Sequence, residues 1–453
     1  MASIPELLHS AVQLHRDGHW EAARKLYEQA LSQDPRDATT LNLLGVLYCQ
    51  TGQDAVGIKC LRQSIAIAPR NVDSHFNLAK ALHAQHKYEE AEDHFRAVLE
   101  IAPDHADSLS GLAAIGLIRG NWTAAKKYCQ RVLQLRPDDP ESHFLLGTLL
   151  LTEGDFERGW PEFEYRARCP SIVGRKFTQP RWDGSSRPGQ AILLYGEYGL
   201  GDVLQFIRYA PGVSKRAERV FIEVPSSLLP LLESSGFANL VAHDKPLPDF
   251  DFELPLTSLP GVFKTTLETI PADVPYIFAN ASYLDKWRQR LAGVEGFKVG
   301  VHWQGSHAYQ NDRHRSMQLA NFEPLASVPG VRLISLQKGP GERQIADVPN
   351  RFSVIALDGL DEQGGAFMDT AAVVHQLDLV ISSDSAVAHL AGSMGIRTWL
   401  VIPFSADWRW FLDREDCPWY PTMRLFRQTK LDDWPELFAR IAAELSLIVK
   451  QKP

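Results

Sequence analysis

The sequence predicts an α + α/β fold, in which an all-α solenoid of helix pairs is followed by two doubly wound α/β lobes. Two observations predict this class. Prolines recur every 34 residues through the first third of the chain, at Pro35, Pro69, Pro103 and Pro137. After residue 190, short apolar runs bounded by glycine alternate with helical patterns, which is typical of parallel strands buried on both faces of a sheet. A chain of 453 residues is also long enough for two or three folded units.

Composition and charge exclude several classes of protein. Apolar residues make up 45% and charged residues 23%, as in ordinary soluble globular proteins. The net charge of -8 argues against a nucleic-acid partner, which normally needs a basic face. The five cysteines match neither a disulfide framework nor a zinc site, so we expect a reducing compartment. The start lacks the pattern of a signal peptide and no apolar stretch reaches the length of a bilayer, so we expect a cytoplasmic location and no membrane span.

Other positions keep the same 34-residue step as the prolines. Small residues, which let two helices approach closely, form two columns: Ala11, Gly45, Ala79, Ala113 and Gly147, and Ala23, Gly57, Ala91, Ala125 and Gly159. A mostly bulky, apolar column consists of Tyr27, Leu61, Phe95, Cys129 and Phe163. A turn column, where glycine relieves the steric cost of a left-handed helix end, consists of Gly18, Gly52, His86, Gly120 and Gly154. These columns resemble the tetratricopeptide repeat (TPR), in about five copies from residue 4 to about 168.

Stacked TPR helix pairs form a superhelix, and its concave face holds an extended peptide or a partner's helix. We therefore expect a protein acceptor or partner on this face. The candidate groove residues are polar positions on the first helices: Asn42, His75, Asn77 and Lys80. The alternative for each of them is a solvated position with no role in binding.

The expected domains are a TPR superhelix at 1–170, a linker rich in glycine, proline and serine at 171–190, a first lobe at 191–290 and a second lobe at 291–453. The expected strands are 191–195, 219–224, 298–303, 331–336, 378–382 and 398–402. Ligands of doubly wound sheets bind beyond the carboxyl ends of the strands. The loops that follow these strands are therefore the candidate sites.

The loop after the first expected strand, GEYGLGD at 196–202, is rich in glycine. Its glycines let the backbone approach a ligand, and the helix start beyond it offers N–H groups to anionic or polar groups. Asp202 stands at this helix start, where the alternative role is helix capping. The expected acceptor or sugar pocket consists of Glu197, Tyr198, Gly199, Gly201, Gln205 and Trp408.

A second loop, Ser382-Ser383-Asp384-Ser385, leads from a strand into a helix. Ser385 and His389 share one face of that helix near its start, where the dipole and unpaired amides favour a diphosphate. The alternative is again helix capping, with His389 packed against the sheet.

Basic residues also follow strand ends at the same edge. Arg313 and Arg315 lie in the loop after 298–303, together with Gln304, and Lys338 follows the next strand. Together they could neutralise a diphosphate leaving group, although single surface cations are usually just solvated.

Two further motifs have competing explanations. Trp408 and Trp410 follow the strand at 398–402 and could stack on a base or sugar, or close a lobe interface. Asp249 and Asp251 have the spacing of a metal-binding DxD. The alternation DFDFEL is better explained by a strand with one wet face, so we expect no metal site.

From about residue 158 to 440 the sequence is similar to bacterial TPR-containing glycosyltransferases. Their GT-B domain, made of two Rossmann-like lobes, is related to the ADP-heptose heptosyltransferase family (glycosyltransferase family 9). The matching segments are, in order, ILLYGEYGLGDVLQFIRYAP, VGVHWQGS with NDRHRS, LISLQKGP, DLVISSDSAVAHLAGSMG and PFSADWRWFLDREDCPWYPTMRLFRQ.

The resemblance implies specific roles. Asp202 would be the general base, and Asp384, Ser385 and His389, with Ser383 beside them, would bind the donor's diphosphate and nucleotide. The basic phosphate ligand of the family matches no single residue here, so Arg313, Arg315 and Lys338 remain open alternatives, with Gln304 as a further donor contact. The resemblance also implies inverting transfer without a metal or cofactor, and a last helix, from about Asp432 to Val449, that crosses back to brace the first lobe.

The expected function is transfer of a sugar from a nucleotide sugar to a hydroxyl of a protein held by the repeats, similar to flagellin and other protein O-glycosyltransferases. One alternative is a heptosyltransferase-like enzyme that acts on a lipid or polysaccharide acceptor. The other is a non-catalytic scaffold whose transferase fold has degenerated.

Overall fold

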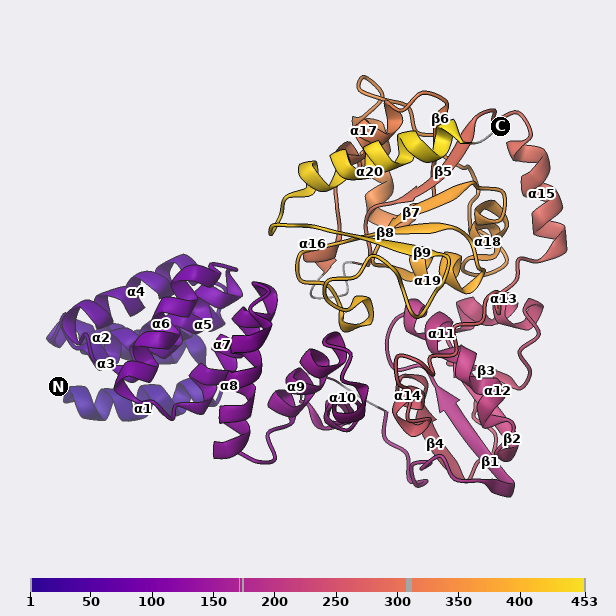
Figure 1. Ribbon diagram of the computed structural model, residues 1–453. Helices are drawn as coiled ribbons and strands as arrows, with labels where there is room; N and C mark the ends of the chain where they lie inside the picture. Colours follow the sequence, from indigo (N-terminus) through magenta and orange to yellow (C-terminus); the bar gives the residue numbers. More distant parts are fainter. Residues whose placement is uncertain (1, 171, 173–174, 307–311, 452–453) are drawn as a thin grey trace. The chain divides into compact units, whose positions relative to one another are not determined.

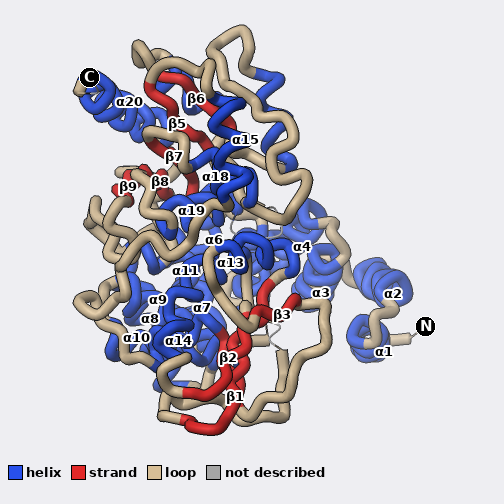
Figure 2. The backbone as a smooth tube through the Cα atoms, turned by 90° about the vertical axis from the view of Figure 1, so that its right-hand side faces the viewer, coloured by secondary structure: helices blue, strands red, loops and turns tan. Residues whose placement is uncertain are grey.

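The computed structural model describes residues 2–170, 172, 175–306 and 312–451. The chain divides into two compact units, Met1–Leu146 and Gly147–Pro453 (Figure 1). The first is made of helices, and the second contains both sheets of the protein (Figure 2).

Paired helices make up the first unit. They are α1 (Ile4–Arg16), α2 (Trp20–Gln33), α3 (Ala38–Gln50), α4 (Asp54–Ile67), α5 (Val72–Ala84), α6 (Tyr88–Ile101), α7 (Ala106–Ile118) and α8 (Trp122–Leu135), and α9 (Pro140–Thr152) follows them. Asp37 and Asn71 cap α3 and α5 by accepting hydrogen bonds from the amides of Thr40 and Ser74.

The turn column behaves as predicted. The φ angles are 79° at Gly18, 77° at Gly52, 63° at His86, 71° at Gly120 and 82° at Gly154, all in the left-handed region. These turns end the first helix of each pair. The small columns are also confirmed as sites of close approach, because a Cβ on Gly45 would lie 2.8 Å from Leu61 Cγ.

The first sheet of the second unit is wholly parallel, with the strand order β3-β2-β1-β4. Its strands are β1 (Arg187–Tyr195), β2 (Ala217–Val224), β3 (Leu240–Ala242) and β4 (Phe252–Pro255). The helices of this lobe are α11 (Leu200–Phe206), α12 (Ala210–Val213), α13 (Leu229–Ser234) and α14 (Leu259–Val262). The expected strands at 191–195 and 219–224 are confirmed, and the strand in DFDFEL corresponds to β4.

The second sheet is also parallel, with the order β6-β5-β7-β8-β9. Its strands are β5 (Phe297–His302), β6 (Val331–Ser335), β7 (Leu379–Ser383), β8 (Thr398–Ile402) and β9 (Met423–Arg427). Its helices are α15 (Ala281–Leu291), α16 (Asp312–Arg315), α17 (Glu323–Ala326), α18 (Met368–Val374), α19 (Ala386–Ser393) and α20 (Trp434–Lys450). Single-turn or irregular 3-10 helices are η1 (Glu164–Arg168), η2 (Ile207–Tyr209), η3 (Ser226–Leu228), η4 (Leu256–Ser258), η5 (Leu319–Phe322), η6 (Gly339–Asp347) and η7 (Trp408–Trp410).

The last helix does not brace the first lobe, in contrast to the expectation. Leu437, Phe438, Ile441 and Leu445 of α20 belong to the hydrophobic core beneath the second sheet. The ring centroids of Phe322 and Phe438 are 4.7 Å apart. This apolar stripe anchors α20 to its own lobe. Figure 1 shows the helix lying with the second sheet.

The unit boundary also differs from the expected break at residue 170. The last helix of the repeat pattern, α10 (Phe156–Phe163), packs on the α/β region, where Trp160 Nε1 donates a hydrogen bond to the carbonyl of Thr265 at 2.9 Å. At the other expected boundary, α15 packs on α18, where Trp287 Nε1 donates to Asp369 Oδ1 at 2.6 Å. The helix at 281–291 therefore belongs with the second sheet.

Candidate functional site

The two sheets meet where α11 crosses α19, directly beyond the carboxyl ends of β1 and β7. A Cβ on Gly201 would lie 2.8 Å from Cδ2 of His389, so only glycine leaves room for this crossing. Asp202 follows it, and Asp202 Oδ2 accepts a hydrogen bond from the Gly199 amide at 3.1 Å. Asp202 thus has the capping role considered as an alternative, and it also stands at the lobe interface.

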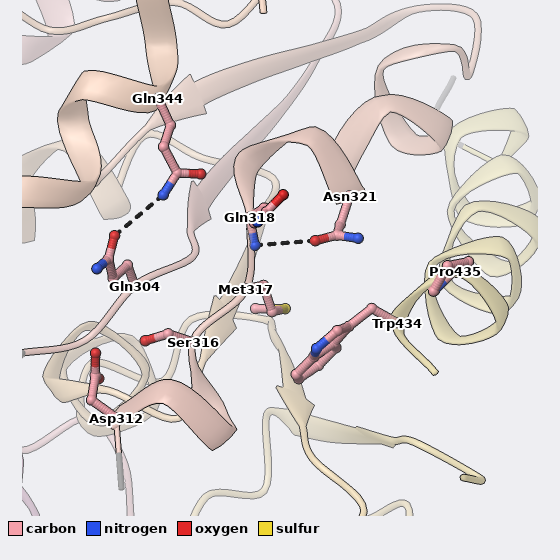
Figure 3. Close-up of a pocket in the computed structure, with 9 residues that line it drawn as sticks. All are labelled: Gln304, Asp312, Ser316, Met317, Gln318, Asn321, Gln344, Trp434 and Pro435. Atoms are coloured by element: carbon pink, nitrogen blue, oxygen red, sulfur yellow. Dashed lines mark hydrogen bonds between the residues drawn. The ribbon is translucent and has the colours of Figure 1, made fainter. Parts of the chain in front are cut away.

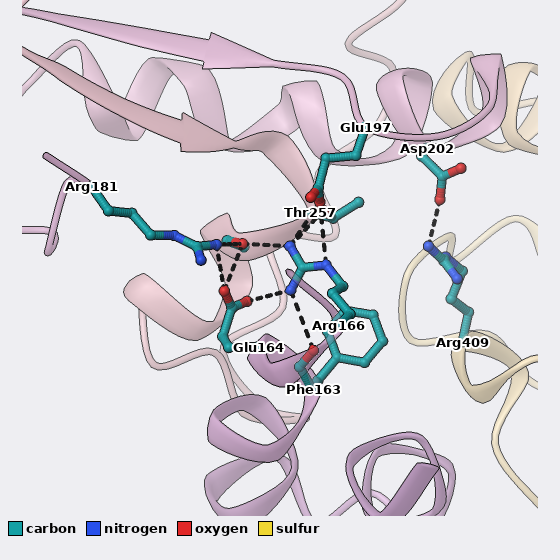
Figure 4. Close-up of polar contacts among 9 residues, drawn as sticks. Phe163, Glu164, Arg166, Arg181, Glu197, Asp202, Thr257 and Arg409 are labelled. Carbon is teal, nitrogen blue, oxygen red and sulfur yellow. Dashed lines mark hydrogen bonds and ion pairs between the residues drawn. The ribbon is translucent and has the colours of Figure 1, made fainter. Parts of the chain in front are cut away.

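Arg409 joins Asp202 from the opposite lobe (Figure 4). The residue lies in η7, after β8, and its Nη2 is 2.5 Å from Asp202 Oδ1. Its Nη1 is 2.8 Å from Asp407 Oδ1 and its Nε donates to Gln205 Oε1 at 2.6 Å. Burial raises the pKa of Asp202 above its usual range, although the charge of Arg409 opposes the shift. The side chain of Asp202 keeps 22% of its surface exposed, so a substrate can reach it.

The serine loop after β7 packs around a buried histidine. Ser385 Oγ and Ser383 Oγ lie 3.1 Å and 3.4 Å from His302 Nδ1. Burial lowers the pKa of His302 to about 3, with the charge of Arg315 adding to the effect. His302 is therefore neutral at neutral pH. The hydroxyl of Ser385 does not cap α19, so it serves this cluster instead.

His389 is packed rather than open. Its Nδ1 lies 2.9 Å from the Tyr420 hydroxyl, and its ring is 5.4 Å from that of Trp410. Burial lowers its pKa well below the usual value, so this side chain offers no positive charge to a diphosphate at neutral pH. The alternative considered for His389, packing in the interior, therefore fits this geometry.

Arg315 is the candidate basic residue that the structure brings to the lobe interface. Its positive charge lowers the pKa values of Asp202, Asp384, His302 and His389. Burial and the charge of Asp407 nevertheless raise the pKa of Asp384 to about 6. Lys338 is half-exposed and lies 3.7 Å from Glu342 instead. The side chain of Arg313 falls outside the described residues.

Several residues of the expected acceptor or sugar pocket are buried or form contacts within the protein. Glu197 binds the buried Arg166, and Gln205 has no exposed surface. Trp408 is 3% exposed, and its ring lies 5.4 Å from Trp160 and 5.9 Å from Trp419. It closes the lobe interface, the second explanation considered for this residue, and does not present a face for stacking on a sugar. Tyr198, in contrast, is 41% exposed beside Asp202.

A cavity of about 520 Å³ opens in the second lobe next to this site (Figure 3). It is lined by Gln304, Asp312, Ser316, Met317, Gln318, Asn321, Gln344, Trp434 and Pro435. Gln304, an expected donor contact, accepts a hydrogen bond from Gln344 Nε2 at 3.2 Å. Asp312 links the cavity to the lobe interface, since its Oδ1 is 3.3 Å from Arg315 Nε.

Sequence reasoning missed the residues that hold this site together, chiefly Arg409, Asp407, His302 and Tyr420. The available signal was position, because Asp407 and Arg409 follow the end of β8 and His302 ends β5. The same loop contains Trp408 and Trp410, whose aromatic side chains offer a functional explanation that does not involve the charged pair.

The groove candidates of the first unit are partly engaged with one another. Asn77 Nδ2 donates to Asn42 Oδ1 at 3.0 Å, and Asn42 is 7% exposed. His75 Nδ1 lies 3.0 Å from His94 Nδ1, whereas Lys80 is exposed. The two asparagines therefore form a ladder between neighbouring first helices.

The described part of the chain offers neither a metal-binding cluster nor a membrane-spanning helix. Those residues contain no group of three histidine, cysteine or acidic side chains arranged to hold a metal ion. Nor do they contain a helix whose length and apolarity would allow it to cross a bilayer.

Known proteins match either a part of this chain or nearly all of it. Profiles of the tetratricopeptide repeat match residues 7–39, 36–104 and 117–170. Protein FlbA of Caulobacter vibrioides is 24% identical over 450 residues, which cover 93% of this chain and 69% of FlbA. Among solved structures, MamA is 17% identical with a TM-score of 0.32, covering 34% of this chain and 91% of MamA. PilF of Pseudomonas aeruginosa is 20% identical with a TM-score of 0.34, covering 36% of this chain and 75% of PilF. The chain therefore contains tetratricopeptide repeats between residues 7 and 170, followed by an α/β region, and it has a distant relative in FlbA.

Proposed function

We propose that the chain is a glycosyltransferase of the GT-B type, which moves a sugar from a nucleotide sugar to a hydroxyl group of a protein. The observation that carries the proposal is the pairing of Asp202, beyond the end of β1, with Arg409, beyond the end of β8. The pair joins a carboxylate at the edge of one parallel sheet to the edge of the other, where the hydroxyl of Ser385 lies beside His302. Ligands of parallel α/β sheets bind at such edges.

Asp202 has the properties required of a general base. Its two oxygens each accept one hydrogen bond, from Arg409 and from the Gly199 amide, and a carboxylate oxygen has a further lone pair for an incoming hydroxyl. In the proposed step Asp202 takes the proton of the acceptor hydroxyl as its oxygen bonds to the anomeric carbon. The bond from that carbon to the diphosphate breaks, and the nucleoside diphosphate leaves with the electron pair, inverting the anomeric centre.

The second lobe would stabilise the leaving group. Arg315 supplies the positive charge, and Ser383 and Ser385 supply hydroxyl donors beside the start of α19. Arg409 fixes Asp202 and offers further positive charge at the same interface. The nucleoside would extend toward the cavity that contains Gln304, because Asp312 and Arg315 connect the two places.

The repeats favour a protein as the acceptor, since TPR superhelices bind peptides on their concave face. The test is co-expression of the chain with flagellin, followed by measurement of the intact mass of flagellin. The proposal expects an added mass of one or more sugar residues, which an Asp202→Asn variant does not produce. Label that enters only lipid or polysaccharide would instead identify a heptosyltransferase-like enzyme. Absence of both transfer and nucleotide binding would identify a non-catalytic scaffold.

A further inference from the structure

Arg166 is a fully buried cation beside the loop that carries Asp202. It lies in η1, and its side chain has 0% exposed surface. Its Nε and Nη2 both donate to Glu197 Oε2, at 3.2 Å and 2.8 Å (Figure 4). Glu197 belongs to the glycine-rich loop between β1 and α11, so Arg166 holds this loop through two charge-assisted hydrogen bonds to one carboxylate oxygen.

The guanidinium group of Arg166 also forms hydrogen bonds with a second loop of the first lobe. Its Nη2 donates to Thr257 Oγ1 at 2.9 Å and to Ser258 Oγ at 2.5 Å, in η4 after β4. Thr257 in turn donates to Glu197 Oε2. Arg166 therefore ties the ends of the neighbouring strands β1 and β4 to the helical segment that precedes the sheet.

Glu164 and Arg181 complete this cluster at its partly exposed side. Arg166 Nη1 donates to Glu164 Oε1 at 2.7 Å, and Arg181 binds the other oxygen of Glu164. Arg166 and Arg181 thus face the carboxylates of Glu164 and Glu197. A third carboxylate, that of Glu253, lies close enough to interact with the charges of this cluster. A lysine in place of Arg166 would keep the charge, but its point-like ammonium group could not span Glu197, Thr257 and Glu164 in the way that the planar fork does.

We propose that Arg166 is a positioning residue: it fixes the 196–202 loop through Glu197, so that Asp202 is presented to Arg409 and to the acceptor hydroxyl. This inference rests on the proposed transferase function. Its physical basis is that displacement of a catalytic group by about 1 Å is enough to cost on the order of 100-fold in rate.

The experiment compares Arg166→Lys and the double variant Arg166→Met/Glu197→Gln with a matched control, Arg216→Met. The double variant removes both charges and so avoids a stranded buried carboxylate that would block folding. Arg216 also lies in the first lobe, where it donates to the Gly184 carbonyl at 2.9 Å and covers the ring of Phe263 at 4.3 Å. It precedes β2, at the sheet edge opposite the site.

Two readouts are measured on the full chain: amide hydrogen exchange of peptides spanning 196–206, and kcat and KM for sugar transfer. In both Arg166 variants we expect the loop to exchange faster by about 10-fold and kcat to fall by at least about 10-fold, with donor KM changed less than about 2-fold. Arg166→Lys is expected to retain more activity than the double variant. The Arg216→Met control changes the melting temperature but neither loop exchange nor kcat.

Unchanged exchange of the 196–206 amides in both Arg166 variants overturns the positioning role. So does a kcat that falls no further than in the control. Because exchange is measured without substrate, it decides the role of Arg166 in holding the loop even if the wild-type chain transfers no sugar. Failure of transfer in the wild type would overturn the proposed function itself.

Discussion

At the scale of single residues, the candidate site depends on a carboxylate and a guanidinium held in contact across two lobes. Asp202 and Arg409 are both largely buried, and each has a further partner: the Gly199 amide for Asp202, and Asp407 with Gln205 for Arg409. Loss of the contact would leave a buried charge uncompensated on either side, and this cost holds the two side chains in one geometry. Pre-organisation of this kind is what proton transfer in an active site requires.

Replacement of Asp202 by asparagine tests its proposed role as the general base. The amide keeps the size of the side chain but cannot accept a proton, so we expect kcat to fall by about 100- to 10,000-fold while the dissociation constant of the nucleotide sugar changes less than about 3-fold. Steady-state kinetics and isothermal titration calorimetry measure the two quantities. The control is Asp249→Asn on the exposed surface, which is expected to leave kcat unchanged. Full activity in Asp202→Asn would exclude it as the base.

Asp384 should make nucleotide binding depend on pH. Its pKa of about 6, raised by burial and by Asp407, means that the carboxyl is charged at pH 7.5 and neutral at pH 5. A charged Asp384 opposes a diphosphate, so Asp384→Asn should bind a nucleoside diphosphate up to about 10-fold more tightly than the wild type at pH 7.5. The advantage should vanish as the pH falls below about 6. The ratio of the two dissociation constants cancels the titration of the nucleotide itself, and a ratio independent of pH would contradict the assignment.

At the scale of elements, the crossing of α11 over α19 brings the two sheets together. The crossing is close because Gly201 faces the His389 ring without a side chain. His389 is in turn fixed by Tyr420, so the helix start that carries Asp202 rests on a rigid surface. The position of Asp202 thus follows from helix packing as much as from its own loop.

Gly201→Ala should therefore destabilise the second unit, although alanine is normally better than glycine in a helix by about 0.5–1 kcal/mol. The added Cβ would lie 2.8 Å from His389 Cδ2, and overpacking of this kind costs about 1–3 kcal/mol. Urea unfolding measures the change. At Gly293 a Cβ would meet no atom within 4 Å, so Gly293→Ala serves as the control. A Gly201→Ala variant as stable as the wild type would show that the crossing is looser than described.

At the scale of the whole molecule, buried neutral histidines link folding to pH. Burial holds the pKa of His302 at about 3, against a model-compound value of 6.5. The unfolded chain therefore binds more protons than the folded chain below about pH 6.5. The stability that His302 contributes is complete above that pH and is lost as the pH falls toward about 3.

We expect the free energy of unfolding to fall by up to about 1.4 kcal/mol per pH unit below pH 6.5 for each such histidine. His302→Gln removes one titrating group while keeping a hydrogen-bonding side chain near Ser383 and Ser385, so its slope should be shallower by about that amount. Most of the 11 tryptophans lie in the second unit, so fluorescence during urea unfolding reports on it. Identical slopes in both proteins would mean that His302 is not buried in the neutral form.

Much of this architecture could be predicted from the sequence, because periodicity is a local signal. The left-handed turn column and most apolar strands of the two sheets depend on neighbouring residues, and the structure confirms them. The strands β3 and β9 are not among the expected ones, because LVA is only three residues long and MRLFR lacks the glycine-bounded apolar run of the others. The packing of α20 was also predicted wrongly, because an apolar stripe shows that a helix is buried but not on which lobe.

The site was harder to predict than the fold. Strand ends located the loops of Asp202, Asp384 and Arg315, but which side chains meet depends on the crossing of two helices from different lobes. Arg409 is distant from Asp202 in sequence, and no local pattern links them. Trp408 shows the converse, since an aromatic residue after a strand end has the same sequence signature whether it binds a ligand or fills an interface.

The proposed function requires that a nucleoside diphosphate bind between the two sheets, against Arg315. Isothermal titration of UDP, GDP and ADP into the full chain and into Arg315→Met tests it most directly, with the exposed Arg343→Met as the control. The claim predicts one-site binding of at least one nucleotide, weakened by about 10-fold or more in Arg315→Met and unchanged in the control. Binding that is absent for all three nucleotides, or equal in the wild type and Arg315→Met, would contradict it.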